Sequence, residues 1–456
     1  MTLVARAKPP WRPSLNAFQI VLIAFTTFVM IGAALLSLPA AHASGPHRFV
    51  DDLFTAASAV CVTGLATIDP GSSYSPLGQV ILLLLVQIGG LGYMTLFTLG
   101  TLFVGRRLSM RDRIAIQVTA DQHGLGGLVK FVRRILIFTV IAELLGAIGL
   151  AACWIPAHGM AYGSWLALFH SVSAFNNAGY SLFPTGAVGL QAHAPILLIL
   201  SLLIILGSLG FNVIHELSCR ISRRLSEVGP TWTPLSIIVL TLTGAFLVAG
   251  TLGIWVFEHA NPRTLGPMGP GVQLLNAFFM AVQPRTAGFN SIDMAALADP
   301  TVMLLLVFMF VGGGPGGTAG GIKLTTFAIV LAAVWSTLRG QADVNLPRLR
   351  RRVNESLVRK SFVVVMLSGT FILGIATLID ILEPHAFLPV LFEVVSAFCT
   401  CGLSLGITPH LGDASKLLLA LTMLVGRVGI LTVMLSVFVA RRPSAVRYGE
   451  EPLMIG

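Results

Sequence analysis

The residues with the clearest chemical potential are four glycines, each near the end of a short segment that recurs along the chain. A phenylalanine precedes each glycine by ten positions, and successive glycines lie between 109 and 115 residues apart. Four similar units predict a ring about one axis, and glycine-bearing turns on that axis predict an ion path lined by backbone carbonyls. The segments run from Leu53 to Leu65, Leu168 to Tyr180, Ala277 to Phe289 and Leu391 to Leu403.

The chemistry expected of these turns is coordination of a dehydrated alkali cation by main-chain oxygens. Carbonyls hold such an ion without a strong counter-charge, so the ion can also leave, and glycine permits the angles that turn successive carbonyls toward one axis. The alternative, four glycines that only cap helices, does not explain four copies at matched depth. The candidate ion-binding residues are Val62, Thr63, Gly64, Asn177, Ala178, Gly179, Thr286, Ala287, Gly288, Thr400, Cys401 and Gly402.

The composition indicates a membrane protein. The chain has 456 residues, of which 55% are hydrophobic and only 11% charged, and its mean hydropathy is +0.86. A soluble domain carries about 25% charged residues. The shortage of charge therefore predicts that the lipid bilayer surrounds most of the chain.

The charge distribution predicts the orientation. The net charge is +10, and 23 of the 29 Lys and Arg residues fall in five clusters. Positive-inside bias places all five on the cytoplasmic side, with both termini. The sequence shows no soluble domain with interleaved basic and aromatic residues, so we exclude nucleic acid as a partner. The clusters are Arg6, Lys8 and Arg12; residues 106–134, 220–224 and 339–360; and Arg441, Arg442 and Arg447.

Eight apolar runs organise the chain, and each glycine segment lies between two of them. A spanning helix needs about 20 apolar residues. The nine or so residues before each turn give about 14 Å of helix, so they can only enter the membrane and return. We therefore expect an all-α integral membrane protein with eight transmembrane helices, in four helix–pore loop–helix repeats around a central pore. The runs lie near 15–38, 77–104, 131–155, 195–217, 234–257, 301–338, 361–382 and 416–440.

The repeats are assigned to residues 1–105, 106–225, 226–345 and 346–456. In three of them the second apolar run contains a G-x-x-G pair. Small residues allow close helix approach, so we interpret these pairs as packing sites. The pairs are Gly89 with Gly92, Gly207 with Gly210, and Gly426 with Gly429.

The third repeat differs, because its second run breaks at Gly312 to Lys323, which reads GGGPGGTAGGIK. Glycines and Pro315 do not hold a helix there. We expect a mobile gate beneath the filter, with a static kink as the alternative. A phosphate-binding loop is excluded, since Ile322 interrupts the required Gly-Lys pair. The candidate gate residues are Gly312, Gly313, Gly314, Gly316, Gly317, Thr318, Gly320, Gly321, Lys323 and Arg427.

Charged residues inside the apolar runs need partners. Arg427 costs about 2.5–3.5 kcal/mol at mid-membrane, so we expect it to face the gate loop as a positive barrier. A structural ion pair with Glu143 is the alternative. Lys323 either reaches toward the membrane surface or holds the loop, and Arg285 is a candidate partner of Glu393.

An enzyme is the alternative from a different class, but the sequence shows no nucleophile and base within the apolar runs. His170 is interpreted as a hydrogen-bonded packing residue. Cys399 and Cys401 look like half of a metal site, but no second pair completes it, so we expect no transition metal. The odd number of five cysteines predicts no disulfide framework. No bound cofactor is expected, only the transported cation.

The segments CVTGL, NNAGY, RTAGFNSID and TCGLSLGITP resemble those of the Trk/Ktr/HKT superfamily of cation transporters, over nearly the whole chain. Because the chain begins directly at the first helix of the first repeat, it resembles the KtrB-type membrane subunits of Ktr potassium uptake systems more than TrkH. The resemblance implies K⁺ uptake in a bacterial inner membrane, a homodimer with one pore per subunit, and a cytosolic nucleotide-binding ring of the RCK type, like KtrA, as regulator.

The resemblance leaves open which cation is carried and whether its transport is coupled to another ion. In the superfamily, serine at the first filter glycine accompanies Na⁺ selectivity, so Gly64 favours K⁺. Cys61, Cys399 and Cys401 depart from the usual pattern, and a transporter of Na⁺ or of both ions is the alternative. Channel-like flux and symport with Na⁺ or H⁺ are both compatible with the sequence.

Overall fold

The computed structural model describes residues 17–43, 47–92, 128–184, 186–222, 231–341, 343–346 and 351–437. The two terminal basic clusters and most of the cluster at 106–134 lie outside the described residues. So do the repeat boundaries near 105 and 225, and the division into repeats stays a prediction.

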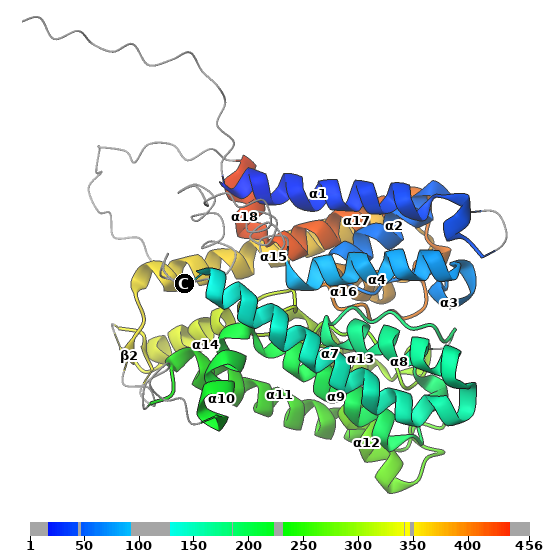
Figure 1. Ribbon diagram of the computed structural model, residues 1–456. Helices are drawn as coiled ribbons and strands as arrows, with labels where there is room; N and C mark the ends of the chain where they lie inside the picture. The colour runs from blue at the N-terminus through cyan, green and yellow to red at the C-terminus, as the bar shows by residue number, and fades with distance from the viewer. Residues whose placement is uncertain are drawn as a thin grey trace, which may run out of the picture.

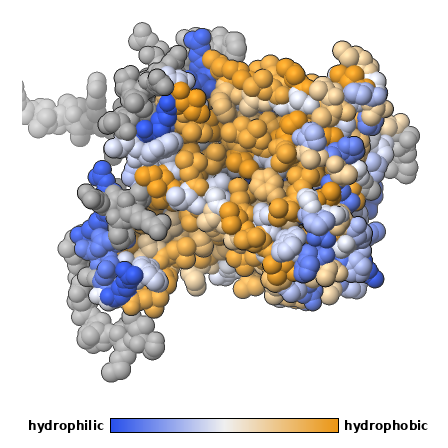
Figure 2. All heavy atoms as spheres, turned by 90° about the horizontal axis from the view of Figure 1, so that it is seen from below, coloured by the Kyte–Doolittle hydropathy of each residue, from blue (hydrophilic) through white to orange (hydrophobic). Residues whose placement is uncertain are grey.

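Four long helices open the four units and are apolar enough, by length and composition, to cross a membrane. Their outward faces carry large hydrophobic side chains: Leu145, Val248 and Met366 are 66%, 61% and 68% exposed. Figure 2 shows an apolar band between two ends richer in hydrophilic residues. This pattern is typical of a surface that faces lipid. The helices are α1 (Ala17–Leu36), α7 (Leu128–His158), α11 (Pro234–Glu258) and α15 (Glu355–Leu382).

A shorter helix follows each long one and ends at the predicted filter turn. At 12 to 16 residues, these pore helices do not cross a bilayer. They are α2 (Phe49–Val60), α8 (Met160–Phe175), α12 (Pro270–Val282) and α16 (Phe387–Phe398). The expected alternation of spanning helix and re-entrant segment is present in all four units.

A second apolar helix completes each unit, and within the described residues none runs the full length of its predicted span. These are α4 (Pro76–Leu91), α9 (Ala194–Leu209), α13 (Asp299–Phe310) and α17 (Asp413–Val428). The chain resumes as α10 (Phe211–Ile221), α14 (Leu324–Leu338) and α18 (Ile430–Val437) in the last three units. The break between α9 and α10 turns the chain by 108°.

The sequence located these second helices but did not predict that three of them end at the second glycine of a G-x-x-G pair. Gly92, Gly210 and Gly429 end α4, α9 and α17 with φ angles of 76°, 91° and 90°. These left-handed angles suit glycine and terminate a right-handed helix. Within the described residues, four continuous helices are long and apolar enough to cross a membrane. The bent pair of α9 and α10 is also long and apolar enough when taken as one span.

The long helices of the four units run in the same general direction (Figure 1), and the contacts between units follow a cyclic order. The first pore helix, α2, contacts α4 of its own unit and α17 of the last unit. Each of the other pore helices also contacts the second helix of the preceding unit: α8 contacts α4, α12 contacts α9 and α16 contacts α13. Each pore helix is thus held against the preceding unit, and the fourth unit closes on the first.

The remaining elements are short. One two-stranded ladder lies in the arginine-rich linker, where β1 (Asn345–Leu346) pairs antiparallel with β2 (Arg351–Arg352). These strands were not predicted from the sequence. The other short elements are η1 (Pro39–Ala41), α3 (Pro70–Ser73), η2 (Val188–Leu190), η4 (Met294–Ala296) and η6 (Thr408–His410).

Candidate ion filter and gate

The four predicted filter turns share one unusual backbone pattern. The residue two positions before each glycine has a left-handed φ: 58° at Val62, 60° at Asn177, 68° at Thr286 and 50° at Thr400. Each glycine is left-handed too, with φ of 91° at Gly64, 69° at Gly179, 77° at Gly288 and 86° at Gly402. In each turn, the residue between these two positions does not have a positive φ.

Such angles are costly for side-chain-bearing residues, above all for β-branched Val62, Thr286 and Thr400, at about 1–3 kcal/mol each. These four are the only non-glycine residues with positive φ in the part of the chain that the structure describes. Strain that recurs at four equivalent positions is characteristic of a functional backbone conformation. Alternating left- and right-handed residues bring successive carbonyls to the same side of the chain, as a carbonyl-lined ion path requires.

The four turns meet one another in a closed ring. A Cβ added to Gly64 would come within 3.0 Å of the carbonyl oxygen of Ala178, and one on Gly179 would lie 2.5 Å from that of Ala287. A Cβ on Gly288 would lie 2.8 Å from the oxygen of Cys401. A Cβ on Gly402 would come within 3.0 Å of the oxygen of Thr63, which completes the circuit. These four contacts bring together eight of the twelve predicted filter residues, and the other four directly precede them in the chain.

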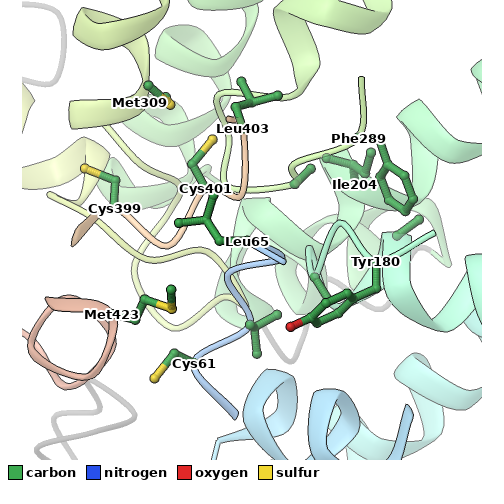
Figure 3. Packing of buried hydrophobic residues seen from close by; sticks show 14 of the residues in the cluster. Cys61, Leu65, Tyr180, Ile204, Phe289, Met309, Cys399, Cys401, Leu403 and Met423 are labelled. Carbon is green, nitrogen blue, oxygen red and sulfur yellow. The ribbon is translucent and has the colours of Figure 1, made fainter. Parts of the chain in front are cut away.

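Buried hydrogen bonds hold the turns in place. The amide of Gly64 donates to the Ser58 hydroxyl at 3.0 Å, and the Asn177 side chain donates to the carbonyl oxygen of Arg285 at 2.8 Å. The residues after the four glycines pack among buried hydrophobic side chains (Figure 3). They are Leu65, Tyr180, Phe289 and Leu403, each at most 2% exposed.

The first glycine of each G-x-x-G pair packs directly against the C-terminal end of the pore helix in its own unit. A Cβ on Gly89, Gly207 or Gly426 would come within 3.0 Å of the carbonyl oxygen that ends the pore helix of its own unit, at Val60, Phe175 or Phe398. The packing interpretation of these glycines is therefore confirmed. The second glycine of each pair has the different role of ending the helix.

The glycine-rich segment of the third unit forms a compact loop against α9. The amide of Gly314 donates to the Ser208 oxygen at 2.8 Å, and the amide of Thr318 donates to the Gly207 oxygen at 3.2 Å. A Cβ on Gly320 would come within 3.0 Å of the Thr400 hydroxyl and of the Cys399 carbonyl. The loop therefore touches the fourth filter turn, as a gate beneath the filter would.

Two cations fix this loop. The Lys323 ammonium donates to the Ala319 oxygen at 2.6 Å, so this lysine holds the loop. Arg427 donates to the carbonyl oxygens of Thr318 and Gly89, which places its guanidinium between the loop and the first unit. Arg427 contacts the loop, whereas Glu143 accepts from the Asn176 side chain at 2.9 Å, so the ion-pair alternative was wrong.

The interactions of three other side chains were also predicted from the sequence. Arg285 does not bind Glu393, because it donates to the hydroxyl and carbonyl oxygens of Thr243 at 3.3 and 3.1 Å. Glu393 instead accepts from the Ser404 hydroxyl at 2.6 Å within its own unit. The prediction that His170 is a hydrogen-bonded packing residue is confirmed, since its buried ring forms a hydrogen bond with the Leu166 carbonyl oxygen at 2.8 Å.

Sequence reasoning missed one buried ion pair. The Lys416 ammonium lies 2.7 Å from Asp51 Oδ1, and both side chains are at most 11% exposed. The pair joins the first turn of α2 in the first unit to the first turn of α17 in the last. A lysine at the start of an apolar run indicates that a partner is needed. The sequence does not show which residue that is, because Asp51 lies in the first repeat, far from Lys416 along the chain.

The comparison with known families agrees with this geometry. The profile of the TrkH family, described as a cation transport protein, matches residues 6–446. The chain belongs to the TrkH family. It is therefore a multi-pass membrane cation transporter and not an enzyme.

Individual TrkH-family relatives match almost the whole chain. The Ktr system potassium uptake protein B of Bacillus subtilis is 36% identical over 96% of this chain and 96% of that protein. The protein of the same name from Vibrio alginolyticus is 36% identical over 96% of this chain and 94% of its own length. The potassium/sodium uptake protein NtpJ of Enterococcus hirae is 34% identical over 98% of each.

The fold is shared with a solved TrkH-family structure. The crystal structure of the potassium transporter TrkH from Vibrio parahaemolyticus matches with a TM-score of 0.73 and 18% identity, over 94% of this chain and 86% of that one. At this identity the match shows the helical membrane fold. It agrees with the predicted fold class.

Proposed function

We propose that this chain takes up K⁺ across the cell membrane through the ring of filter turns. The observation that carries the proposal is the circuit from Gly64 through Gly179 and Gly288 to Gly402, each against the carbonyl that precedes the next glycine. Rings of backbone oxygens replace the hydration shell of K⁺. Glycine rather than serine at position 64 and the names of two relatives support the choice of K⁺.

The experiment is growth rescue of a bacterium that lacks K⁺ uptake, at low K⁺, with and without Na⁺. Wild-type chain restores growth, whereas a variant with alanine at Gly288 does not, because a side chain there enters the ring. Failure of the wild-type chain to restore growth or Rb⁺ uptake, despite normal membrane insertion, refutes the proposal.

A second candidate is transport of Na⁺ or of both ions by the same ring. The relative named as a potassium/sodium uptake protein favours it. Competition separates the two: excess Na⁺ leaves Rb⁺ uptake unchanged for a K⁺-selective filter and suppresses it for a mixed one.

The gate proposal is that the loop at 312–323 obstructs the path below the filter and moves to open it. Its support is the contact of Gly320 with Thr400 and the bridge from Arg427 to Thr318. Deletion of residues 314–319 raises Rb⁺ flux in this scheme. Unchanged flux and unchanged regulation favour a static kink.

The assembly proposal is a homodimer whose cytosolic face, with both termini, binds a nucleotide-binding ring of the RCK type. The Ktr system names of two relatives support a multi-component system. The basic linkers, including Arg351 and Arg352, support the orientation. Cysteine labelling of the linkers in intact cells and pull-down of a soluble nucleotide-binding partner test the two parts separately.

A further inference from the structure

A cavity of about 260 Å³ lies between α7 and α10, at the end of the molecule that carries the basic linkers. No filter residue lines it, but the amide of Phe211, one of its lining residues, donates to the Gly316 oxygen of the loop at 312–323, at 3.2 Å. Five residues of α7 and six from α10 and its C-terminal end line it. They are Arg134, Ile135, Ile137, Phe138 and Ile141, and Phe211, Ile214, His215, Ser218, Cys219 and Ser222.

The α7 wall changes from basic to apolar with depth. Arg134 lies near the start of the membrane-crossing part of α7, and Ile137, Phe138 and Ile141 follow at i+3, i+4 and i+7 on the same face. From Arg134 to Ile141 the helix rises about 10 Å. Ile137 and Ile141 are 49% and 51% exposed, so this wall opens toward lipid.

The α10 wall is one face of a helix whose opposite face is fixed. Glu216 accepts hydrogen bonds from the Thr233 amide at 3.0 Å and from the Thr233 and Ser236 hydroxyls, which anchors α10 to the start of α11. Because α10 turns 108° from α9, it runs across the end of the span rather than along it. Helices in this position lie in the membrane interface.

The outer part of the cavity is cationic and rich in donors. Arg134 Nη1 lies 3.0 Å from His215 Nε2, so the arginine brings the positive charge beside the imidazole ring. Ser218 and Ser222 add hydroxyl groups. Among the described lining residues there is no carboxylate, since Glu216 points to α11. The site is complementary to an anion with an apolar tail.

We propose that the α7–α10 cavity binds an anionic phospholipid, with the phosphate at Arg134 and the upper part of one acyl chain against Ile137 and Ile141. Ligand pockets that enclose a whole drug-sized molecule measure about 300–1,000 Å³, so this cavity takes only the headgroup end of a lipid. Basic pockets between membrane helices at this level recognise anionic headgroups. The site adds a lipid partner to the transporter and does not depend on which ion is carried.

The test is lipid retention by the full-length protein. Wild-type chain and variants are placed in phosphatidylcholine nanodiscs with or without phosphatidylglycerol, released, and analysed by native mass spectrometry for bound phosphatidylglycerol. We expect Arg134→Gln to weaken retention about five-fold, the equivalent of about 1 kcal/mol for one basic residue at an anionic surface. The control Arg133→Gln removes a neighbouring exposed arginine that does not line the cavity.

A second pair of variants tests the acyl slot without changing charge. Ile141→Trp fills the cavity and lowers phosphatidylglycerol retention, whereas Ile148→Trp, two turns deeper on α7 and 67% exposed, does not. Equal losses for Arg134→Gln and Arg133→Gln show non-specific attraction and overturn the proposal. Unchanged retention in Ile141→Trp with an altered oligomeric state identifies a second copy of the chain as the occupant and also overturns it.

Discussion

A Cβ atom on Gly402, in the last unit, would come within 3.0 Å of the backbone oxygen of Thr63, in the first unit. This contact closes the circuit of filter turns and joins segments at opposite ends of the chain. Lys416 also pairs with Asp51 between the same two units. One backbone approach and one buried ion pair thus join the first and last units, and each can be tested.

Alanine at Gly402 should abolish the ring without unfolding the chain. Gly402 has φ of 86°, and its added Cβ would meet Thr63, so we expect Rb⁺ uptake to fall at least about ten-fold, the effect of about 1–2 kcal/mol of backbone strain before the clash is counted. Gly406→Ala is the matched control, because Gly406 has φ of 92° but open space around it. Equal uptake by the two variants would contradict the ring.

Replacement of Lys416 by Met should destabilise the protein strongly. It leaves the Asp51 carboxylate buried without its partner, which costs about 3–5 kcal/mol. Thermal unfolding in detergent measures the loss, and the double variant Lys416→Met with Asp51→Asn should recover part of it. The exposed pair of Arg48 and Asp413 is the control, since Arg48→Ala should cost less than about 1 kcal/mol.

Alanine at Gly426 tests the support behind the filter. The added methyl group would overlap the carbonyl oxygen of Phe398 at the end of α16, and overpacking of this kind costs about 1–3 kcal/mol. We expect a lower unfolding temperature. Gly369→Ala on α15 has open space and should leave that temperature unchanged or raise it, because alanine favours a helix by about 1 kcal/mol over glycine. A stable Gly426→Ala protein would show that α16 and α17 can separate freely.

Removal of Arg427 should increase flux. Arg427 bridges the loop at Thr318 to Gly89, and loss of both contacts and of the positive charge frees the loop and lowers the barrier to a cation. Rb⁺ uptake per folded molecule of Arg427→Ala in liposomes should exceed that of wild type. Arg339→Ala removes an exposed charge at the end of α14 and should change nothing. A lower yield of folded protein with unaltered flux would assign Arg427 a structural role.

The sequence predicted the elements of the site well because their signals are local. A span is a continuous apolar run, and a glycine at a turn is visible in the sequence, so the four short re-entrant helices, the break after Phe310 and the glycine turns after those helices were located correctly. The breaks at Gly210 and Gly429 were missed, since the apolar runs continue through them and hydropathy does not detect a change of backbone angle.

What the sequence determined by itself is the fourfold repetition, the membrane location and the positions where glycine is required, because each depends on residue type within one short segment. The tertiary structure decided which turn faces which, that Arg427 meets Thr318 rather than Glu143, and that Lys416 pairs with Asp51. It also forced Val62 into a left-handed angle that its β-branched side chain disfavours. These outcomes depend on contacts between distant segments, whose energies outweigh local preference only once the four units have packed.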